Sequence, residues 1–232
     1  MMKEIFNQNP HLLFYTVLAG SVLMIRVPLL GKYFRTVNTL LHESGHALAA
    51  VLTSGEVISI ELSSDTSGSA FTKSGSKLKA MMVSFAGYPV AAMLSGILIA
   101  YTTTHQPKIV FFLLLTIALL NLTLFVRNFY GIVWLFSFSA LILFIFWLGD
   151  ETLSYLFALA VTLISFSETV FSTLIILYLS LFQPKKAGDA SNLARVSGIP
   201  AAIWGILITA SVSYIVWFTV SRYFPFPFKP LI

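Results

Sequence analysis

Residues 40–52 read Leu-Leu-His-Glu-Ser-Gly-His-Ala-Leu-Ala-Ala-Val-Leu, an apolar run interrupted by two histidines and a glutamate. The two histidines, His42 and His46, are four residues apart. At 3.6 residues per turn, this spacing sets them about 40° apart on one face of a helix, one turn above the other. Both imidazoles can then reach a single metal ion. The run therefore predicts a helix that carries a metal-binding face.

The chain as a whole has the composition of a membrane protein. Of its 232 residues, 57% are hydrophobic and only 10% are charged, against about 25% charged in a typical soluble domain. So few charged groups cannot cover a water-facing surface, and lipid must therefore cover most of it. The net charge of +5 fits basic loops and tails that face anionic lipid. No Lys/Arg-rich run is long enough to indicate nucleic-acid binding.

The hydrophobic segments predict an all-α polytopic membrane protein with six to seven transmembrane helices. A helix that crosses the bilayer needs about 20 mostly apolar residues. The first segment is expected to be a retained transmembrane helix rather than a cleaved signal peptide. The candidate segments are residues 11–30, 36–54, 80–101, 108–126, 129–148, 152–182 and 200–222.

The segment that follows the motif helix, residues 55–79, is predicted to fold as a small β-hairpin at the membrane surface. Residues 57–62 are rich in β-branched side chains and partly alternate in polarity. Residues 63–68 have the composition of a turn, and residues 69–73 can form the returning strand.

A second polar segment, residues 183–199, is expected to contain a short interfacial helix from Ala190 to Val196. The sequence has no repeat of fixed period and no low-complexity tract. Residues 1–232 are therefore treated as one integral membrane domain.

The metal that the motif predicts is Zn²⁺. The chain has no cysteine, so nitrogen and oxygen atoms must hold any metal. Glu43 lies beside the two histidines without being a ligand, and it can act as general base on a water molecule that zinc makes more acidic. The alternative is a polar packing site whose histidines bond to neighbouring helices. Ionisable groups are costly inside a membrane, which favours a functional site.

A catalytic zinc normally takes a third protein ligand. Two carboxylates are candidates: Asp189 in the last polar segment, and Glu168 inside the long hydrophobic run 152–182. Asp189 is equally compatible with a helix N-cap before Ala190. Glu168 is also compatible with a hydrogen-bonded or snorkelling acid.

The motif and several later segments resemble the site-2 protease family of membrane zinc metallopeptidases, and in particular its small bacterial branch. Leu41–Ala50 is similar to the family's H-E-x-G-H-A-L-A-A. The resemblance covers roughly residues 36–210 and includes these further segments: Gly55–Leu62, Ser67-Gly68, Ala86-Gly87-Tyr88, the R-N-x-x-G-like Val126–Gly131, and Gly188–Trp204.

This resemblance implies a zinc metalloendopeptidase that hydrolyses peptide bonds in or near the membrane spans of substrate proteins, as a multi-pass protein of the bacterial cytoplasmic membrane. Asp189 matches the S-D-A position of the branch and is the first choice for the third ligand, with Glu168 second. The sequence departs from the better-known members, because it has no N-P-D-G or L-D-G segment.

The expected partners are a membrane-protein substrate and the lipid bilayer. A substrate helix must unwind before cleavage, and an edge strand of the hairpin could pair with the unwound segment. Ile58 and Ile60 on the first strand and Gly87 at the start of the next helix are the candidate substrate contacts. The alternatives are a plain connecting hairpin and simple helix packing.

Two other functions compete with a peptidase. One is a catalytically silent membrane scaffold or sorting protein that keeps the fold, and the other is a small-molecule transporter or channel. Zinc content separates the first two functions from the third. Loss of cleavage in Glu43→Gln with zinc retained separates the enzyme from the scaffold.

Overall fold

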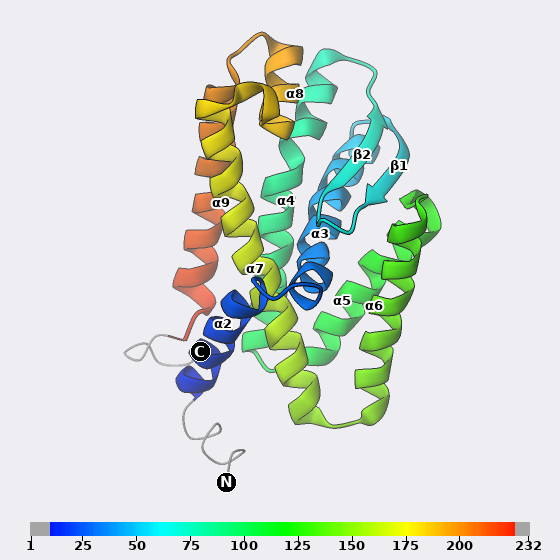
Figure 1. The fold of residues 1–232 in the computed structure, drawn as a ribbon, viewed down its shortest axis with the longest axis vertical. Helices are drawn as coiled ribbons and strands as arrows, with labels where there is room; N and C mark the ends of the chain where they lie inside the picture. The colour runs from blue at the N-terminus through cyan, green and yellow to red at the C-terminus, as the bar shows by residue number, and fades with distance from the viewer. Residues whose placement is uncertain (1–9, 226–232) are drawn as a thin grey trace.

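The computed structural model describes residues 10–225, and this part of the chain contains eight α-helices and one two-stranded hairpin (Figure 1). The mostly helical polytopic class predicted from the sequence is confirmed. The elements in chain order are α2 (Pro10–Met24), α3 (Leu30–Leu52), β1 (Glu56–Leu62), β2 (Gly68–Lys73), α4 (Lys77–Thr103), α5 (Pro107–Leu120), the π-helical turn η1 (Asn121–Phe125), α6 (Phe129–Leu148), α7 (Glu151–Phe182), the short 3-10 helix η2 (Pro184–Lys186), α8 (Gly188–Ser197) and α9 (Ala201–Tyr223).

Five of the described helices are long and apolar enough to cross a membrane: α4, α5 together with η1, α6, α7 and α9. The motif helix α3 has 23 residues but is more polar, since it contains Lys32, Arg35 and Glu43. The predicted segment 11–30 is shorter than expected, because α2 ends at Met24 after 15 residues. A turn that contains Pro28 then separates α2 from α3.

Local sequence signals set several helix ends. Ser76 caps α4 by accepting a hydrogen bond from the Lys79 N–H at 3.3 Å, and Asp150 caps α7 by accepting one from Leu153 N–H at 2.9 Å. The long apolar run predicted at 152–182 is a single helix of 32 residues, about 48 Å in length. This length exceeds the roughly 30 Å hydrocarbon core, so α7 is tilted or extends beyond the bilayer.

The motif helix packs closely against α4, and Gly45 permits this approach. A Cβ atom at Gly45 would lie 2.9 Å from Val90 Cβ and 3.2 Å from the Ala86 carbonyl oxygen. The glycine in the middle of the histidine motif therefore brings the α4 backbone close to the metal-binding face.

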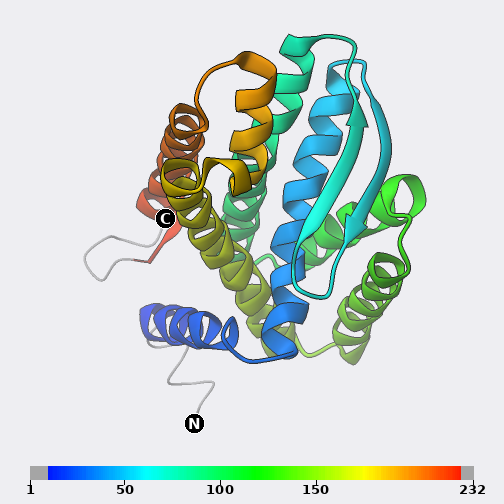
Figure 2. The same ribbon diagram turned by 45° about the horizontal axis from the view of Figure 1, so that its top comes forward.

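The predicted hairpin is confirmed, with β1 and β2 antiparallel and an irregularity between Val57 and Ser59. Figure 2 shows the hairpin running alongside α3, with β2 between α3 and β1. The outer edge of β1 is occupied by the chain after η1. The Arg127 N–H donates to the Ile60 carbonyl at 3.3 Å, and Ile60 forms a parallel bridge with Val126.

The stretch predicted as one helix over 108–126 changes character at its end. Helix α5 stops at Leu120 and continues as the π-helical turn η1. This turn directs the buried Asn121 at the motif helix, where its side-chain amide donates to Ser44 Oγ at 2.9 Å and to the Ile117 carbonyl at 2.9 Å. A π-helical turn is often found at functional sites, and here it ties α5 to the middle of the histidine motif.

Candidate metal centre

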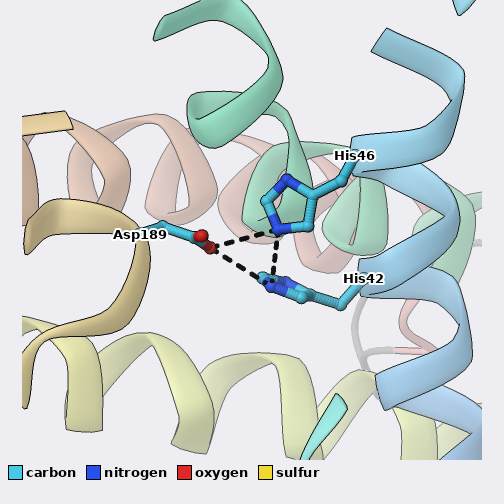
Figure 3. A group of neighbouring side chains, drawn as sticks. All are labelled: His42, His46 and Asp189. Atoms are coloured by element: carbon cyan, nitrogen blue, oxygen red, sulfur yellow. Dashed lines mark hydrogen bonds and ion pairs between the residues drawn. The ribbon is translucent and has the colours of Figure 1, made fainter. Parts of the chain in front are cut away.

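Three side chains from two distant segments converge at one end of the helix bundle. His42 and His46 project from α3, and Asp189 projects from α8 towards both imidazoles (Figure 3). The Nε2 atoms of the histidines are 3.1 Å apart. Asp189 Oδ2 lies 3.2 Å from His42 Nε2 and 3.3 Å from His46 Nε2.

The three atoms form a nearly equilateral triangle whose size fits zinc. Zinc bonds to nitrogen and oxygen are about 2.0–2.2 Å long, so two ligands of a tetrahedral zinc lie about 3.3 Å apart. The triangle, with sides of 3.1, 3.2 and 3.3 Å, matches one face of such a tetrahedron. Two imidazole nitrogens and a carboxylate oxygen are also a donor set that zinc accepts in catalytic sites.

The surroundings of His46 prepare its Nε2 atom for a metal. On the other side of the ring, Nδ1 lies 2.7 Å from the Val83 carbonyl oxygen. A carbonyl only accepts hydrogen bonds, so Nδ1 carries the proton and donates it, which leaves the lone pair of Nε2 free. This second contact fixes both the ring orientation and the tautomer.

Asp189 reaches the histidines because α8 is anchored on its apolar face. Ala190 and Leu193 are buried in a cluster with residues of α7 and α9. Helix α8 begins at Gly188 without a side-chain cap, so Asp189 lies in its first turn and is not its N-cap. Burial by itself raises the pKa of Asp189, but His46 and His42 outweigh it and hold that pKa well below its usual range.

Glu43 lies beside the triangle and is almost completely buried, with 4% of its surface exposed. A Cβ atom at Gly68, the first residue of β2, would lie 2.7 Å from Glu43 Oε1. The side chain predicted as general base is therefore enclosed between α3 and the hairpin.

Helix α4 forms another wall of the site. A Cβ atom at Gly87 would lie 2.6 Å from His46 Nε2 and 2.6 Å from His42 Cε1. Next to it, the Tyr88 ring meets the His42 ring edge to face at a centroid distance of 4.5 Å. Gly87, predicted as a substrate contact, thus lies directly against both imidazoles.

Glu168, the second candidate for the third ligand, lies elsewhere. Its Oε1 atom accepts a hydrogen bond from Arg35 Nη2 at 2.6 Å. The neighbouring Thr169 donates to Asn38 Oδ1 at 2.7 Å. The structure does not bring Glu168 to the histidines, and it gives this intramembrane acid an arginine partner that the sequence analysis did not consider.

The two isoleucines predicted as substrate contacts differ in exposure. Ile58 is 59% exposed, whereas Ile60 is fully buried in the main apolar cluster. Thr39, which was not predicted as a functional residue, lies one turn before Glu43 on the motif helix and contacts the hairpin turn. Its position at i−4 from Glu43 was a signal, because residues with that spacing share a helix face.

Comparison with known proteins agrees with this geometry. No curated protein and no solved structure matches the chain. The family model described as Peptidase M50B-like matches residues 14–219, a range that includes the histidine motif, the hairpin and Asp189. The M50 peptidases are zinc-dependent, in keeping with the donor set assembled here. This multi-pass membrane protein therefore belongs to the Peptidase M50B-like family, whose relatives are site-2-protease-like.

Proposed function

We propose that the protein is an intramembrane zinc metallopeptidase that hydrolyses peptide bonds in or near the membrane spans of other proteins. The observation that carries the proposal is the zinc-sized triangle of His42, His46 and Asp189 with the buried carboxylate of Glu43 beside it. A structural metal site would not need this additional acid. The resemblance to the small bacterial branch supports a location in the cytoplasmic membrane of a bacterium.

In this proposal, His42 Nε2, His46 Nε2 and Asp189 Oδ2 hold the metal. Zinc bound there would supply a Lewis acid that polarises a peptide carbonyl and makes water easier to deprotonate near neutral pH. Glu43 takes a proton from the attacking water as the oxygen bonds to the carbonyl carbon. The same carboxyl group then gives a proton to the leaving nitrogen as the C–N bond breaks. The products are a new carboxyl end and a new amine.

The hairpin supports a model in which the substrate binds as a strand. The sequence analysis placed substrate contacts at Ile58 and Ile60, but the outer edge of β1 is already paired with residues 126–128. Within residues 10–225, no backbone hydrogen bond joins the outer edge of β2 to another segment. We therefore place an added substrate segment at the outer edge of β2, which faces α3 and lies next to Glu43, rather than at β1.

The test uses the full chain purified in detergent. Zinc content is measured by mass spectrometry, and cleavage is measured on single-span reporter proteins whose membrane helix contains a Gly-Pro pair. We expect about one zinc per chain and cleavage within or beside the reporter span. Glu43→Gln should keep the zinc and lose cleavage by at least about 100-fold.

Two results would overturn the proposal. The first is a folded wild-type protein that binds no zinc at near-stoichiometric level. The second is a zinc-loaded protein that cleaves the reporters equally well with Gln at position 43. A zinc-loaded wild type that cleaves none of the reporters would favour the silent scaffold instead.

A further inference from the structure

The turn of the hairpin is fastened to the motif helix one turn away from Glu43. Thr39 is buried at 8% exposure, and its Oγ1 atom donates a hydrogen bond to the Thr66 carbonyl at 2.8 Å. Thr39 and Glu43 are four residues apart on α3, so they lie on the same face of the helix. The turn is therefore held directly over the side chain proposed as general base.

The turn itself is well suited to hold this position. The Thr66 backbone has a positive φ of 73° and its N–H donates to the Ser63 carbonyl at 3.0 Å. Asp65 Oδ1 accepts hydrogen bonds from the Ser67 N–H at 2.9 Å and from Ser67 Oγ at 2.6 Å. These contacts fix the turn internally. Within residues 10–225, the hydroxyl of Thr39 makes the side-chain hydrogen bond that joins this turn to α3.

Gly68, the first residue of β2, lies in contact with the Glu43 side chain. A Cβ atom at Gly68 would be 2.7 Å from Glu43 Oε1, 2.9 Å from Glu43 Cγ and 2.7 Å from Thr39 Cγ2. Gly68 does not have a positive φ angle, so its backbone conformation is open to other residues. The need for glycine at this position therefore comes from its contacts with Glu43 and Thr39.

Ala70 is the next residue of β2 whose backbone faces the same outer edge as Gly68. The carbonyl of Ile60 and the backbone of Leu62 bond to residues 127–128, so they point away from β2. Hydrogen-bonding directions alternate along an antiparallel pair. Ala70, which faces Ile60, therefore directs its backbone N–H to the outer edge of β2, the edge on which Gly68 meets Glu43.

We propose that the outer edge of β2, fastened by Thr39, positions the Glu43 carboxylate for proton transfer, and that Thr39 and Gly68 are positioning residues of the peptidase. This inference rests on the proposed function. The strand that would pair with the substrate is the strand that orients the general base. Substrate binding and the placement of the base are thereby coupled through a single element.

The first test measures cleavage of the single-span reporters by the zinc-loaded full chain. Gly68→Ala moves the carboxylate, and we expect kcat to fall by about 100-fold, the cost of misplacing a catalytic group by about 1 Å. Thr39→Val removes the hydroxyl and keeps the shape, so kcat should fall by about 10-fold, while Thr39→Ser should restore it. In all three variants the zinc content should stay at the wild-type value, and the fall in kcat should exceed any change in KM.

Matched controls are available nearby. Gly75→Ala lies in the connection between β2 and α4, at a glycine with open space around it. Thr36→Val lies on the same helix at a buried threonine whose hydroxyl bonds only to the Lys32 carbonyl of α3. Both controls should cleave the reporters at the wild-type rate.

The second test does not depend on activity. Hydrogen exchange of the Ala70 amide is measured in the metal-free protein by mass spectrometry with residue-level fragmentation. The inference requires the Glu43 carboxylate to protect the Ala70 amide, so this amide should exchange at least about 10-fold faster in Glu43→Ala. In Glu43→Gln an acceptor oxygen remains and the exchange rate should stay near that of the wild type. The Ser69 amide, which faces β1, should not change in either variant.

The results separate this inference from the proposed function. Wild-type cleavage rates in zinc-loaded Gly68→Ala and Thr39→Val would overturn the positioning role. A fall of kcat in Thr39→Val that also occurs in Thr39→Ser would overturn it as well. An Ala70 amide that exchanges equally in wild type and Glu43→Ala would also overturn it. If the wild type itself cleaves nothing, the proposed function fails, while the exchange rates still show whether β2 holds Glu43.

Discussion

Gly87 lies directly against His46, so that a Cβ atom at position 87 would stand 2.6 Å from the His46 Nε2 atom and 2.7 Å from Cε1. The nearer of these two His46 atoms is the one proposed to bind zinc, and His42 Cε1 is equally close at 2.6 Å. The His46 ring cannot move away easily, because Nδ1 on its other side is hydrogen-bonded to the Val83 carbonyl at 2.7 Å. The missing side chain at Gly87 thus makes room for the metal centre.

Gly87→Ala is therefore expected to weaken zinc binding. The added methyl group pushes both imidazoles away from the triangle, and we expect the zinc affinity to fall by about 10- to 100-fold, as for other residues that orient metal ligands. The measurement is a competition titration with a zinc chelator. Gly20→Ala is the control, since this helical glycine has open space around it. Equal affinity in both variants would contradict the steric account.

A second prediction distinguishes the two candidate carboxylates. Asp189→Ala should lower the zinc content far below one per chain, because two histidines alone leave the site incomplete. Glu168→Gln should leave the zinc content unchanged, since Glu168 is paired with Arg35. Zinc is measured by mass spectrometry after gel filtration in detergent. The assignment of Asp189 is wrong if a folded Glu168→Gln protein loses its zinc and a folded Asp189→Ala protein keeps it.

The histidine pair and the hairpin were predictable because their signals are local. The spacing of His42 and His46 follows from the helical period, and the hairpin follows from a β-branched run and a turn. The position of Asp189 beside them is a contact between segments more than 140 residues apart. No local pattern encodes that contact, so residue spacing alone left the choice between Asp189 and Glu168 open.

Other features were hidden for related reasons. The ion pair of Arg35 and Glu168 joins α3 to α7, and no local sequence pattern around either residue predicts the other as its partner. The π-helical turn brings Asn121 into a partly buried hydrogen bond with Ser44, a contact that the local composition does not encode. Gly68 reads as a turn glycine, and only the contact with Glu43 gives it a second role.

The ion pair of Arg35 and Glu168 is expected to contribute to stability. Arg35→Ala leaves the carboxylate of Glu168, 9% exposed, without its partner. Breaking a fully buried pair costs about 3–5 kcal/mol, and since the Arg35 side chain is 29% exposed, we expect about 2 kcal/mol. Thermal unfolding in detergent measures the loss. Arg195→Ala, at an exposed arginine of α8, should change stability by less than about 0.5 kcal/mol. An unchanged melting temperature in Arg35→Ala would show that the pair contributes nothing.

The side chain of Asn128 makes two hydrogen bonds to the backbone of Leu62, as a third strand would. Its removal should leave the Leu62 end of β1 unpaired on that edge. Its side-chain amide donates to the Leu62 carbonyl at 2.6 Å, and its Oδ1 atom accepts from the Leu62 N–H at 3.1 Å. Gly131 makes this possible, because a Cβ atom there would lie 2.6 Å from Asn128 Oδ1. Both Asn128→Ala and Gly131→Ala should therefore speed hydrogen exchange of the Leu62 amide by at least about 10-fold.

The exchange experiment has a control and a discriminating variant. Gln106→Ala, at an exposed side chain, should leave the Leu62 amide unchanged. Asn128→Asp keeps the acceptor oxygen and loses the donor, so the Leu62 amide should stay protected more than in Asn128→Ala. If the Leu62 amide is as well protected in Asn128→Ala and Gly131→Ala as in the wild type, then the side chain of Asn128 does not block the edge of β1. In that case the edge of β1 is open to a substrate strand, and β2 is no longer favoured over β1 as the strand to which the substrate adds.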